Sequence, residues 1–255
     1  MSRMTVRSAL LLAALAPLAL GLGACKKDDK TAAGSEPVVS ATPLATVAAP
    51  AGKSWADTVV QTPEGGYRMG NPDAPIKLIE YGSLTCPHCG EFAEKGTATI
   101  RDQWVASGRV SYEFRHFVRD ALDLTMGLLA SCGGPATYFG QTEQLFAHQK
   151  DLFAGLQAKD AQMQAAMQAP EGQRFQAIAE VAGLPAFMAA RGISAAQAKT
   201  CLANTALASQ MATNTTNQGN QFQIEGTPTF LVNGEKVGTS TWEELKARIE
   251  GMGVR

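Results

Sequence analysis

The sequence lacks the features that identify several classes of protein. Its 22 Lys and Arg residues are balanced by 23 Asp and Glu residues, and no basic stripe or interleaving of basic and aromatic residues occurs. We therefore expect no nucleic-acid partner, because a phosphate backbone requires clustered positive charge. No internal repeat is evident, so repeat architectures are not expected. The apolar run at residues 9–22 is shorter than the roughly 20 residues that a transmembrane helix needs.

The N-terminal residues have the composition of a targeting segment. Arg3 and Arg7 precede the apolar run, which is the arrangement of a signal peptide over residues 1–24. The run ends in Leu-Gly-Ala followed by Cys25, and small residues directly before a cysteine resemble the lipobox of bacterial lipoproteins. This resemblance implies cleavage before Cys25 and lipidation of its sulfur. The alternative is an ordinary secretory cleavage site that abuts a cysteine.

Residues 25–54 differ in composition from the rest of the chain. After a short charged patch they consist mostly of Ala, Pro, Thr, Val and Ser without a helical or strand period, which predicts a disordered tether beginning at the lipidated Cys25. A tether of about 30 residues spans roughly 30 Å. It would hold one well-cored domain, residues 55–255, at the inner or outer membrane of a bacterial cell envelope.

The most informative motif is Cys-Pro-His-Cys at residues 86–89. It follows residues 76–81, which predict a buried strand, and it opens residues 87–106, which predict a helix. A C-x-x-C motif at such a junction is typical of a thioredoxin-like redox site. The first cysteine then lies at a helix N-terminus, where free N–H groups and the helix dipole favour a thiolate. Pro87 suits the first helical turn because its missing N–H would have no partner there.

Metal-based uses of the two cysteines fit the sequence less well. A zinc ribbon requires a second C-x-x-C or a suitably spaced His pair, which the chain lacks, and covalent haem attachment requires His where Gly90 stands. A lipid-anchored carrier of a soft metal remains as an alternative, using Cys86, Cys89 and perhaps His88, because thiolates and imidazole suit such metals.

Two further cysteines, Cys132 and Cys201, lie in predicted helices. An exported protein occupies a compartment that permits disulfides, and we predict a Cys132–Cys201 bridge. It would close a loop of about 70 residues and contribute on the order of 4 kcal/mol to stability. The alternative is two buried, unpaired cysteines.

The order of predicted elements indicates the fold class. A β-α-β unit ends near residue 118, apolar residues at helical spacing fill the next hundred residues, and two strands joined by an Asn-Gly turn precede a last helix. The expected fold class is therefore α/β: a thioredoxin fold, residues 55–118 and 222–255, with an inserted α-helical domain, residues 119–221.

Three features together resemble the DsbA-like thiol:disulfide oxidoreductases: the Cys-Pro-His-Cys motif, the helical insertion and Gly-Thr-Pro-Thr-Phe at residues 226–230. The resemblance covers roughly residues 55–255. It implies that an exposed Cys86 is the attacking sulfur, that Cys89 resolves the mixed disulfide, and that no cofactor beyond the Cys86–Cys89 disulfide is required. It also implies a cis Thr227–Pro228 bond in a loop that contacts the redox cysteines and binds the substrate chain.

Three more residues are given roles in this reading. His88, between the cysteines, would favour the Cys86 thiolate. Glu80 matches an acidic position of the family and would take the proton of Cys89, the alternative being a strand-end glutamate that faces water. Thr227 departs from the aliphatic residue of the best-known oxidant, and reductase and isomerase relatives often carry Thr. His116 lies outside any motif and is expected to be a surface or packing residue.

The sequence therefore predicts a periplasmic thiol:disulfide oxidoreductase of the cell envelope. The first expectation is a dithiol oxidase that donates its disulfide to exported proteins, and a reductase or isomerase with the same site is the alternative. The expected partners are reduced or unfolded exported proteins, a membrane redox partner that reoxidises the site, and the membrane itself through the lipid anchor. No separate N-terminal dimerisation domain is recognised, which argues against the isomerase subfamily with such domains. We expect a monomer.

Overall fold

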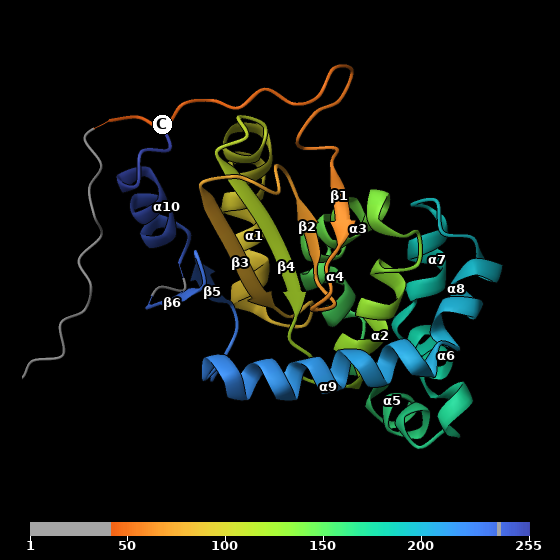
Figure 1. Cartoon of the computed structure of the whole chain (residues 1–255). Helices are drawn as coiled ribbons and strands as arrows, with labels where there is room; N and C mark the ends of the chain where they lie inside the picture. Colours follow the sequence, from red (N-terminus) through yellow and green to blue (C-terminus); the bar gives the residue numbers. More distant parts are fainter. Residues whose placement is uncertain (1–41, 239–240) are drawn as a thin grey trace, which may run out of the picture. The chain divides into compact units, whose positions relative to one another are not determined.

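The structure is a computed structural model in which residues 42–238 and 241–255 are described. The predicted signal peptide, Cys25 and most of the predicted tether lie outside the described residues. Within them a mixed sheet has the strand order β1-β2-β4-β3-β5-β6 (Figure 1).

The central strands form the expected thioredoxin arrangement. Strand β3 (Ile76–Gly82) pairs in parallel with β4 (Val110–His116), and helix α1 (Pro87–Thr99) with a continuing π-helical turn (Ile100–Val105) connects them. Antiparallel pairing joins β3 to β5 and β5 to β6, after which the chain enters the last helix; these elements are β5 (Thr229–Val232), β6 (Glu235–Val237) and α10 (Trp242–Gly251).

A hairpin that the sequence did not reveal extends the sheet beyond β4. Strands β1 (Val59–Gln61) and β2 (Tyr67–Met69) pair with each other, and β2 also pairs antiparallel with β4. Each strand is only three residues long. Such short segments show too few alternations to be recognised from their apolar pattern.

The packed part of the chain also begins before the expected boundary at residue 55. The N–H of Leu44 donates to the Gly253 carbonyl at 2.9 Å, and the Trp55 indole N–H donates to the Val47 carbonyl at 2.7 Å. At Gly108, whose φ is 74°, a Cβ would collide with that same Val47 carbonyl. Residues 44–54 therefore belong to the folded domain. Their composition gives no sign of this, because single hydrogen bonds and close contacts hold them rather than an apolar pattern.

The insertion between β4 and β5 is helical, as predicted. Figure 1 shows α5–α8 gathered to one side of the sheet and α9 running back toward β5. Its helices are α2 (Ala121–Ala130), α3 (Pro135–Ala147), α4 (Gln149–Ala154), α5 (Asp160–Met167), α6 (Glu171–Ala182), α7 (Leu184–Ala189), α8 (Ala195–Leu202) and α9 (Thr205–Phe222), with a short 3-10 turn (Gln157–Lys159) before α5.

The insertion shares one hydrophobic core with the sheet. Tyr138 of α3 stacks on Tyr67 of β2 with ring centroids 3.7 Å apart, and Phe146 of α3 meets Phe114 of β4 edge-on at 6.1 Å. The predicted bridge is present between Cys132, just after α2, and Cys201 of α8, with an S–S distance of 1.99 Å. The insertion is thus packed against the sheet and cross-linked within itself.

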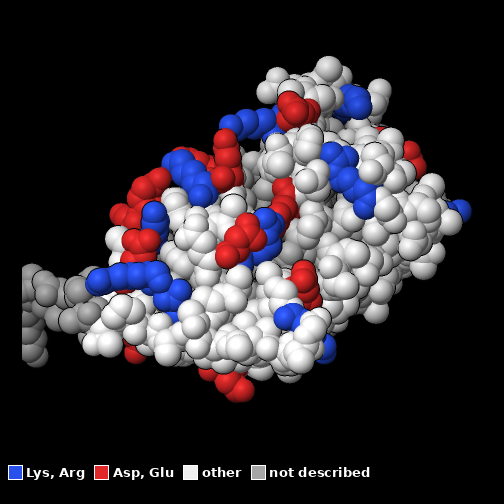
Figure 2. Space-filling view, turned by 90° about the horizontal axis from the view of Figure 1, so that it is seen from above, with Lys and Arg blue, Asp and Glu red and all other residues white. Residues whose placement is uncertain are grey.

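The surface of the domain carries charges of both signs. On the face in Figure 2, Lys and Arg side chains alternate with Asp and Glu side chains and neither sign is concentrated. No helix in the part of the chain that the structure describes has the length and apolar character needed to cross a bilayer.

Candidate active site

Cys86 occupies the N-cap position of α1, as predicted. Its backbone is extended, with φ −85° and ψ 119°, and Pro87 follows in the first turn. The Cys86 carbonyl accepts the N–H of Gly90 at 3.1 Å, which closes that turn. The sulfur therefore lies at the positive end of the helix, next to N–H groups that have no helical partner.

Both thiols are free but neither is open to solvent. Cys86 is 4% exposed and Cys89 0% exposed. The expectation that Cys86 is exposed is therefore wrong. The loop before β5 covers it: Cys86 Sγ lies 3.1 Å from the Thr227 carbonyl oxygen, to which the thiol donates when it is protonated. A substrate has to approach the sulfur alongside this loop.

The two sulfurs differ sharply in acidity. A hydrogen bond with the Cys89 thiol, helped by the Thr227 side chain and by the backbone N–H groups of Cys89 and His88, lowers the pKa of Cys86 to about 5, although burial opposes the shift. Burial chiefly, with the hydrogen bond to Cys86 and the charge of Glu80, raises the pKa of Cys89 well above its ordinary value. At neutral pH, Cys86 is the thiolate and Cys89 the thiol. His88 contributes through its main chain, and its side chain is exposed.

Glu80 lies on β3 beneath the cysteines and is 1% exposed, so the alternative of a water-facing glutamate is wrong. The Tyr112 hydroxyl donates to its Oε2 atom at 2.6 Å. Burial raises the pKa of Glu80 to about 8, the Tyr112 bond opposes this, and the Cys86 charge adds to it. A carboxyl group with such a pKa can hold or accept a proton near neutral pH.

The Thr227–Pro228 peptide bond is cis, as the resemblance implied. The Thr227 hydroxyl is buried and has no hydrogen-bond partner of good geometry. It nevertheless contributes to the lowered pKa of Cys86, so it lies where a small rotation directs its proton at the thiolate.

Two buried side chains from the insertion hold the loop before Cys86, and sequence reasoning missed both. Asp123 of α2 accepts the Leu84 N–H at 2.8 Å. Gln149, the first residue of α4, donates to the carbonyls of Leu84 at 2.8 Å and Cys86 at 3.0 Å. The only sequence signal was an aspartate within an apolar helix, because these partners are far apart along the chain.

Asp123 also pairs with a histidine that was expected to be an ordinary surface or packing residue. His116 Nε2 lies 2.8 Å from Asp123 Oδ1, and both side chains are buried. Burial alone would raise the pKa of Asp123, but the His116 charge and hydrogen bond and the N–H of Arg119 outweigh it and lower that pKa. An anionic Asp123 is a strong acceptor for the Leu84 N–H, which fixes the reactive loop.

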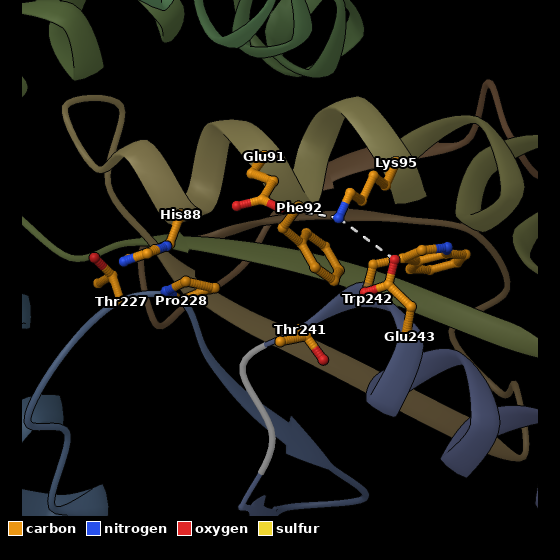
Figure 3. Close-up of a pocket in the computed structure, with 9 residues that line it drawn as sticks. All are labelled: His88, Glu91, Phe92, Lys95, Thr227, Pro228, Thr241, Trp242 and Glu243. Atoms are coloured by element: carbon orange, nitrogen blue, oxygen red, sulfur yellow. Dashed lines mark hydrogen bonds and ion pairs between the residues drawn. The ribbon is translucent and has the colours of Figure 1, made fainter.

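A cleft of about 250 Å³ adjoins the cysteines, between α1, the cis-proline loop and the start of α10. Figure 3 shows His88 extending toward Thr227 and Pro228, and Lys95 between two carboxylates. Lys95 Nζ lies 2.9 Å from Glu91 and 3.5 Å from Glu243. The remaining wall is largely aromatic, formed by Phe92 and Trp242.

Among the described residues, no three side chains of His, Cys, Asp and Glu converge where they could hold a metal ion. Cys86 and Cys89 therefore lack a third ligand of these types in this geometry. The arrangement is suited instead to thiol exchange, with one activated sulfur, one protonated sulfur and an acid beneath them.

Comparisons with known proteins agree with this geometry. The sequence matches the thioredoxin family over residues 62–251. The solved protein-disulfide isomerase of Novosphingobium aromaticivorans is 33% identical, with 75% of this chain and 98% of that chain covered and a TM-score of 0.71. Wolbachia pipientis alpha-DsbA1 shares the fold at 21% identity and a TM-score of 0.58, covering 72% of this chain and 88% of that chain.

A protein of Rickettsia conorii, assigned provisionally as a protein-disulfide oxidoreductase, is 24% identical over 182 residues. The match includes 71% of this chain but only 58% of that relative, so the chain spans little more than half of its length.

Proposed function

Because the chain belongs to the thioredoxin family, we propose that it is a DsbA-like thiol:disulfide oxidoreductase, and specifically a dithiol oxidase that donates the Cys86–Cys89 disulfide to exported proteins. The observation that carries this proposal is the pKa of Cys86, lowered to about 5. A low thiol pKa stabilises the reduced, thiolate form of the site. The Cys86–Cys89 disulfide is therefore readily reduced by a substrate dithiol.

The size of this effect follows from linkage. Lowering the pKa of a thiol from 9.0 to about 5 stabilises the reduced form at pH 7 by on the order of 2–3 kcal/mol. For a two-electron couple this raises the reduction potential by roughly 50 mV. A reduction potential raised in this way makes the Cys86–Cys89 disulfide a stronger oxidant.

The reaction consists of two exchanges. A substrate thiolate attacks the Cys86 sulfur, the Cys86–Cys89 bond breaks, and Cys89 leaves and takes a proton. A second substrate thiolate then attacks the substrate sulfur of the mixed disulfide and releases Cys86 as a thiolate. The substrate dithiol loses two electrons and the protein gains them. Glu80 is placed to give Cys89 its proton and to take it back when a membrane redox partner reoxidises the site.

Isomerisation is the second candidate, since the Novosphingobium relative is named an isomerase and Thr227 favours that branch. In that reaction the Cys86 thiolate attacks an incorrect substrate disulfide, and no net electrons are transferred. The same site serves both reactions, and net oxidation of a reduced two-cysteine substrate, which isomerisation does not produce, distinguishes them.

For the location we propose the periplasm, with the domain anchored at the inner or outer membrane through a lipid on Cys25. The supporting observation is the Leu-Gly-Ala-Cys sequence that ends the apolar run at the N-terminus. The residues between Cys25 and the start of the domain would let the active site reach substrates away from the membrane.

The experiment that tests the proposed function is equilibration of the Cys86–Cys89 pair with glutathione buffers. We expect a potential above that of thioredoxin by at least the roughly 50 mV given above, about −220 mV or higher. A value near −270 mV would identify a reductase and overturn the oxidase assignment.

A further inference from the structure

The Glu80 carboxyl group is held by one hydroxyl group. The Tyr112 hydroxyl donates to Glu80 Oε2 at 2.6 Å, and among the described residues no other group donates to this carboxyl. We propose that Tyr112 is a positioning residue of the redox site, which fixes the rotation of the Glu80 carboxyl and directs its exchangeable proton to Oε1. This inference rests on the proposed function, because it concerns the step in which Cys89 gives up its proton.

The sheet places the two side chains on one face. In the register of β3 and β4, Phe114 is the residue opposite Glu80, and Tyr112 lies two positions before it. Residues opposite each other and residues two apart point to the same face of a sheet. Tyr112 therefore meets the Glu80 carboxyl diagonally, from the neighbouring strand.

The other carboxyl oxygen lies on the side of the redox motif. Gly82 follows two residues after Glu80 on the same face of β3. A Cβ at Gly82 would lie 2.9 Å from Glu80 Oε1 and would collide with the Phe114 ring. Glu80 Oε1 and that ring therefore fill the space that a side chain would take. Oε1 is directed along β3 toward the segment that ends in Cys86, whereas Oε2 is bound to β4 through Tyr112.

Tyr112 acts as the donor in this pair. Burial chiefly, with the charge and hydrogen bond of Glu80, raises the pKa of Tyr112 well above its ordinary value, so its hydroxyl stays protonated. In the part of the chain that the structure describes, Glu80 is the acceptor that this buried hydroxyl has. The oxygen that accepts from Tyr112 is the carbonyl oxygen when Glu80 is protonated, so the acid proton lies on Oε1. Phe139 of α3 packs on the Tyr112 ring, with centroids 5.6 Å apart, and restricts its movement.

The carboxylate form of Glu80 depends on this bond. The titratable groups that act on Glu80 are Tyr112 of β4, Tyr138 of α3, and Cys86 and Cys89 at the start of α1. Within residues 42–238 and 241–255, no cation is among them. Burial raises the pKa of Glu80 to about 8, the Cys86 charge adds to this, and the Tyr112 bond is the interaction that opposes it. Loss of the hydroxyl should therefore keep Glu80 protonated to higher pH.

The step that this affects is the closure of a mixed disulfide. With oxidised glutathione, the Cys86 thiolate attacks one glutathione sulfur, and the other glutathione leaves as a thiolate. Cys89 then gives its proton to Glu80 Oε1 and attacks the Cys86 sulfur. The bond between Cys86 and glutathione breaks, and the second glutathione leaves as a thiolate. The two cysteines lose two electrons and glutathione gains them.

The test follows this closure in the full chain. The reduced protein is mixed with excess oxidised glutathione, and the first-order rate of closure is measured by acid quenching across the pH range in which Glu80 titrates. We expect Tyr112→Phe to move the midpoint of the pH–rate profile upward by about one pH unit, because the carboxylate loses a hydrogen bond. The midpoint of the Cys86 thiolate absorbance, about 5, should not move, because Glu80 is protonated at that pH in both proteins.

Tyr81→Phe is the matched control. Tyr81 follows Glu80 on β3 and points to the other face of the sheet, where its buried hydroxyl accepts from Arg115 at 3.0 Å. Its loss should leave the midpoint of closure unchanged. In a Glu80→Gln background, Tyr112→Phe should also have no effect on the profile. An unshifted midpoint in Tyr112→Phe alone, or the same change with Glu80→Gln present, would show that Tyr112 only packs and would overturn the proposal.

Replacing Tyr112 by 3-fluorotyrosine tests the same bond without removing it. Fluorine makes the hydroxyl a stronger donor, so the midpoint of closure should fall, in the direction opposite to Tyr112→Phe. This measurement decides the matter if Tyr112→Phe does not fold, and an unchanged midpoint would then overturn the proposal.

Failure of the proposed function would look different. A reduction potential near that of thioredoxin, with the midpoint shift present, would reject the oxidase assignment and leave the role of Tyr112 intact. A high potential without the shift would reject the role of Tyr112 alone.

Discussion

Cys86 and Cys89 lie at the start of a helix with both thiols free, whereas Cys132 and Cys201 join the end of α2 to α8 through a closed disulfide. The first pair lies three positions apart and its neighbours favour a thiolate. The second pair is 69 positions apart and constrains the unfolded chain. One protein thus contains one cysteine pair suited to disulfide exchange and one suited to stability. The exchange pair differs because its surroundings stabilise the reduced form as a thiolate.

The largest expected effect comes from removing one sulfur of the exchange pair. Cys86→Ser should abolish disulfide transfer to a reduced peptide, because Cys89 is fully buried and no further free thiol lies in the part of the chain that the structure describes. Cys89→Ser should instead accumulate mixed disulfides with substrates, detectable by non-reducing electrophoresis, since the resolving thiol is lost. Residual transfer by Cys86→Ser above the uncatalysed rate would contradict the assignment.

Removing the Cys132–Cys201 bridge should have the opposite effect: it should lower stability and leave disulfide transfer intact. The double variant Cys132→Ser/Cys201→Ser should lower the free energy of unfolding by about 3–4 kcal/mol, because the unfolded chain regains the freedom of a long loop. Urea denaturation of the two proteins, with Cys86 and Cys89 reduced in each, measures this difference. Loss of disulfide transfer by a double variant that remains folded would show that the two pairs are not independent.

Glu80 should make the stability of the reduced protein depend on pH. Since burial raises its pKa from 4.5 to about 8, the folded protein retains a proton that the unfolded chain releases between these values. The free energy of unfolding therefore falls as pH rises through that window. Glu80→Gln removes this loss, so the variant should gain on the order of 3–4 kcal/mol relative to wild type as pH rises from 5 to 8. Urea denaturation measures the free energy of unfolding of both proteins at pH 5 and at pH 8. The same difference between variant and wild type at both pH values would contradict a buried Glu80 that holds a proton.

The smallest effect concerns the hydroxyl beside the thiolate. Thr227→Val should move the midpoint of the Cys86 thiolate absorbance from about 5 toward about 6, because one favourable interaction with the charged form is lost. His88→Ala is the matched control and should move it less, since the backbone N–H of His88 remains. A larger effect from His88→Ala would give the imidazole the role first expected of it.

The features predictable from the sequence were those coded locally. Pro87 begins α1, Ser194 forms a capping box with Gln197 at the start of α8, and Asn233 and Gly234 adopt the positive φ values, 51° and 87°, of a tight hairpin turn. Each signal depends on a few adjacent residues. The β1–β2 hairpin was missed because its strands have too few residues to show a period. The start of the domain was expected at residue 55, because the single contacts that hold residues 44–54 leave no pattern in the sequence.

The sequence by itself determined that the chain has two thiols at a helix start and a helical insertion, and the resemblance to a known family implied the cis-proline loop. The helix start also predicted a thiolate at Cys86, but the sequence could not determine that Cys86 is buried or that Cys89 and Thr227 help to lower its pKa, because those properties depend on which side chains meet in space. The Cys86 sulfur meets the Thr227 carbonyl across 141 positions, and Gln149 reaches the Cys86 carbonyl across 63. Desolvation and hydrogen bonding act over a few ångströms of space, and only the tertiary structure decides which groups come that close.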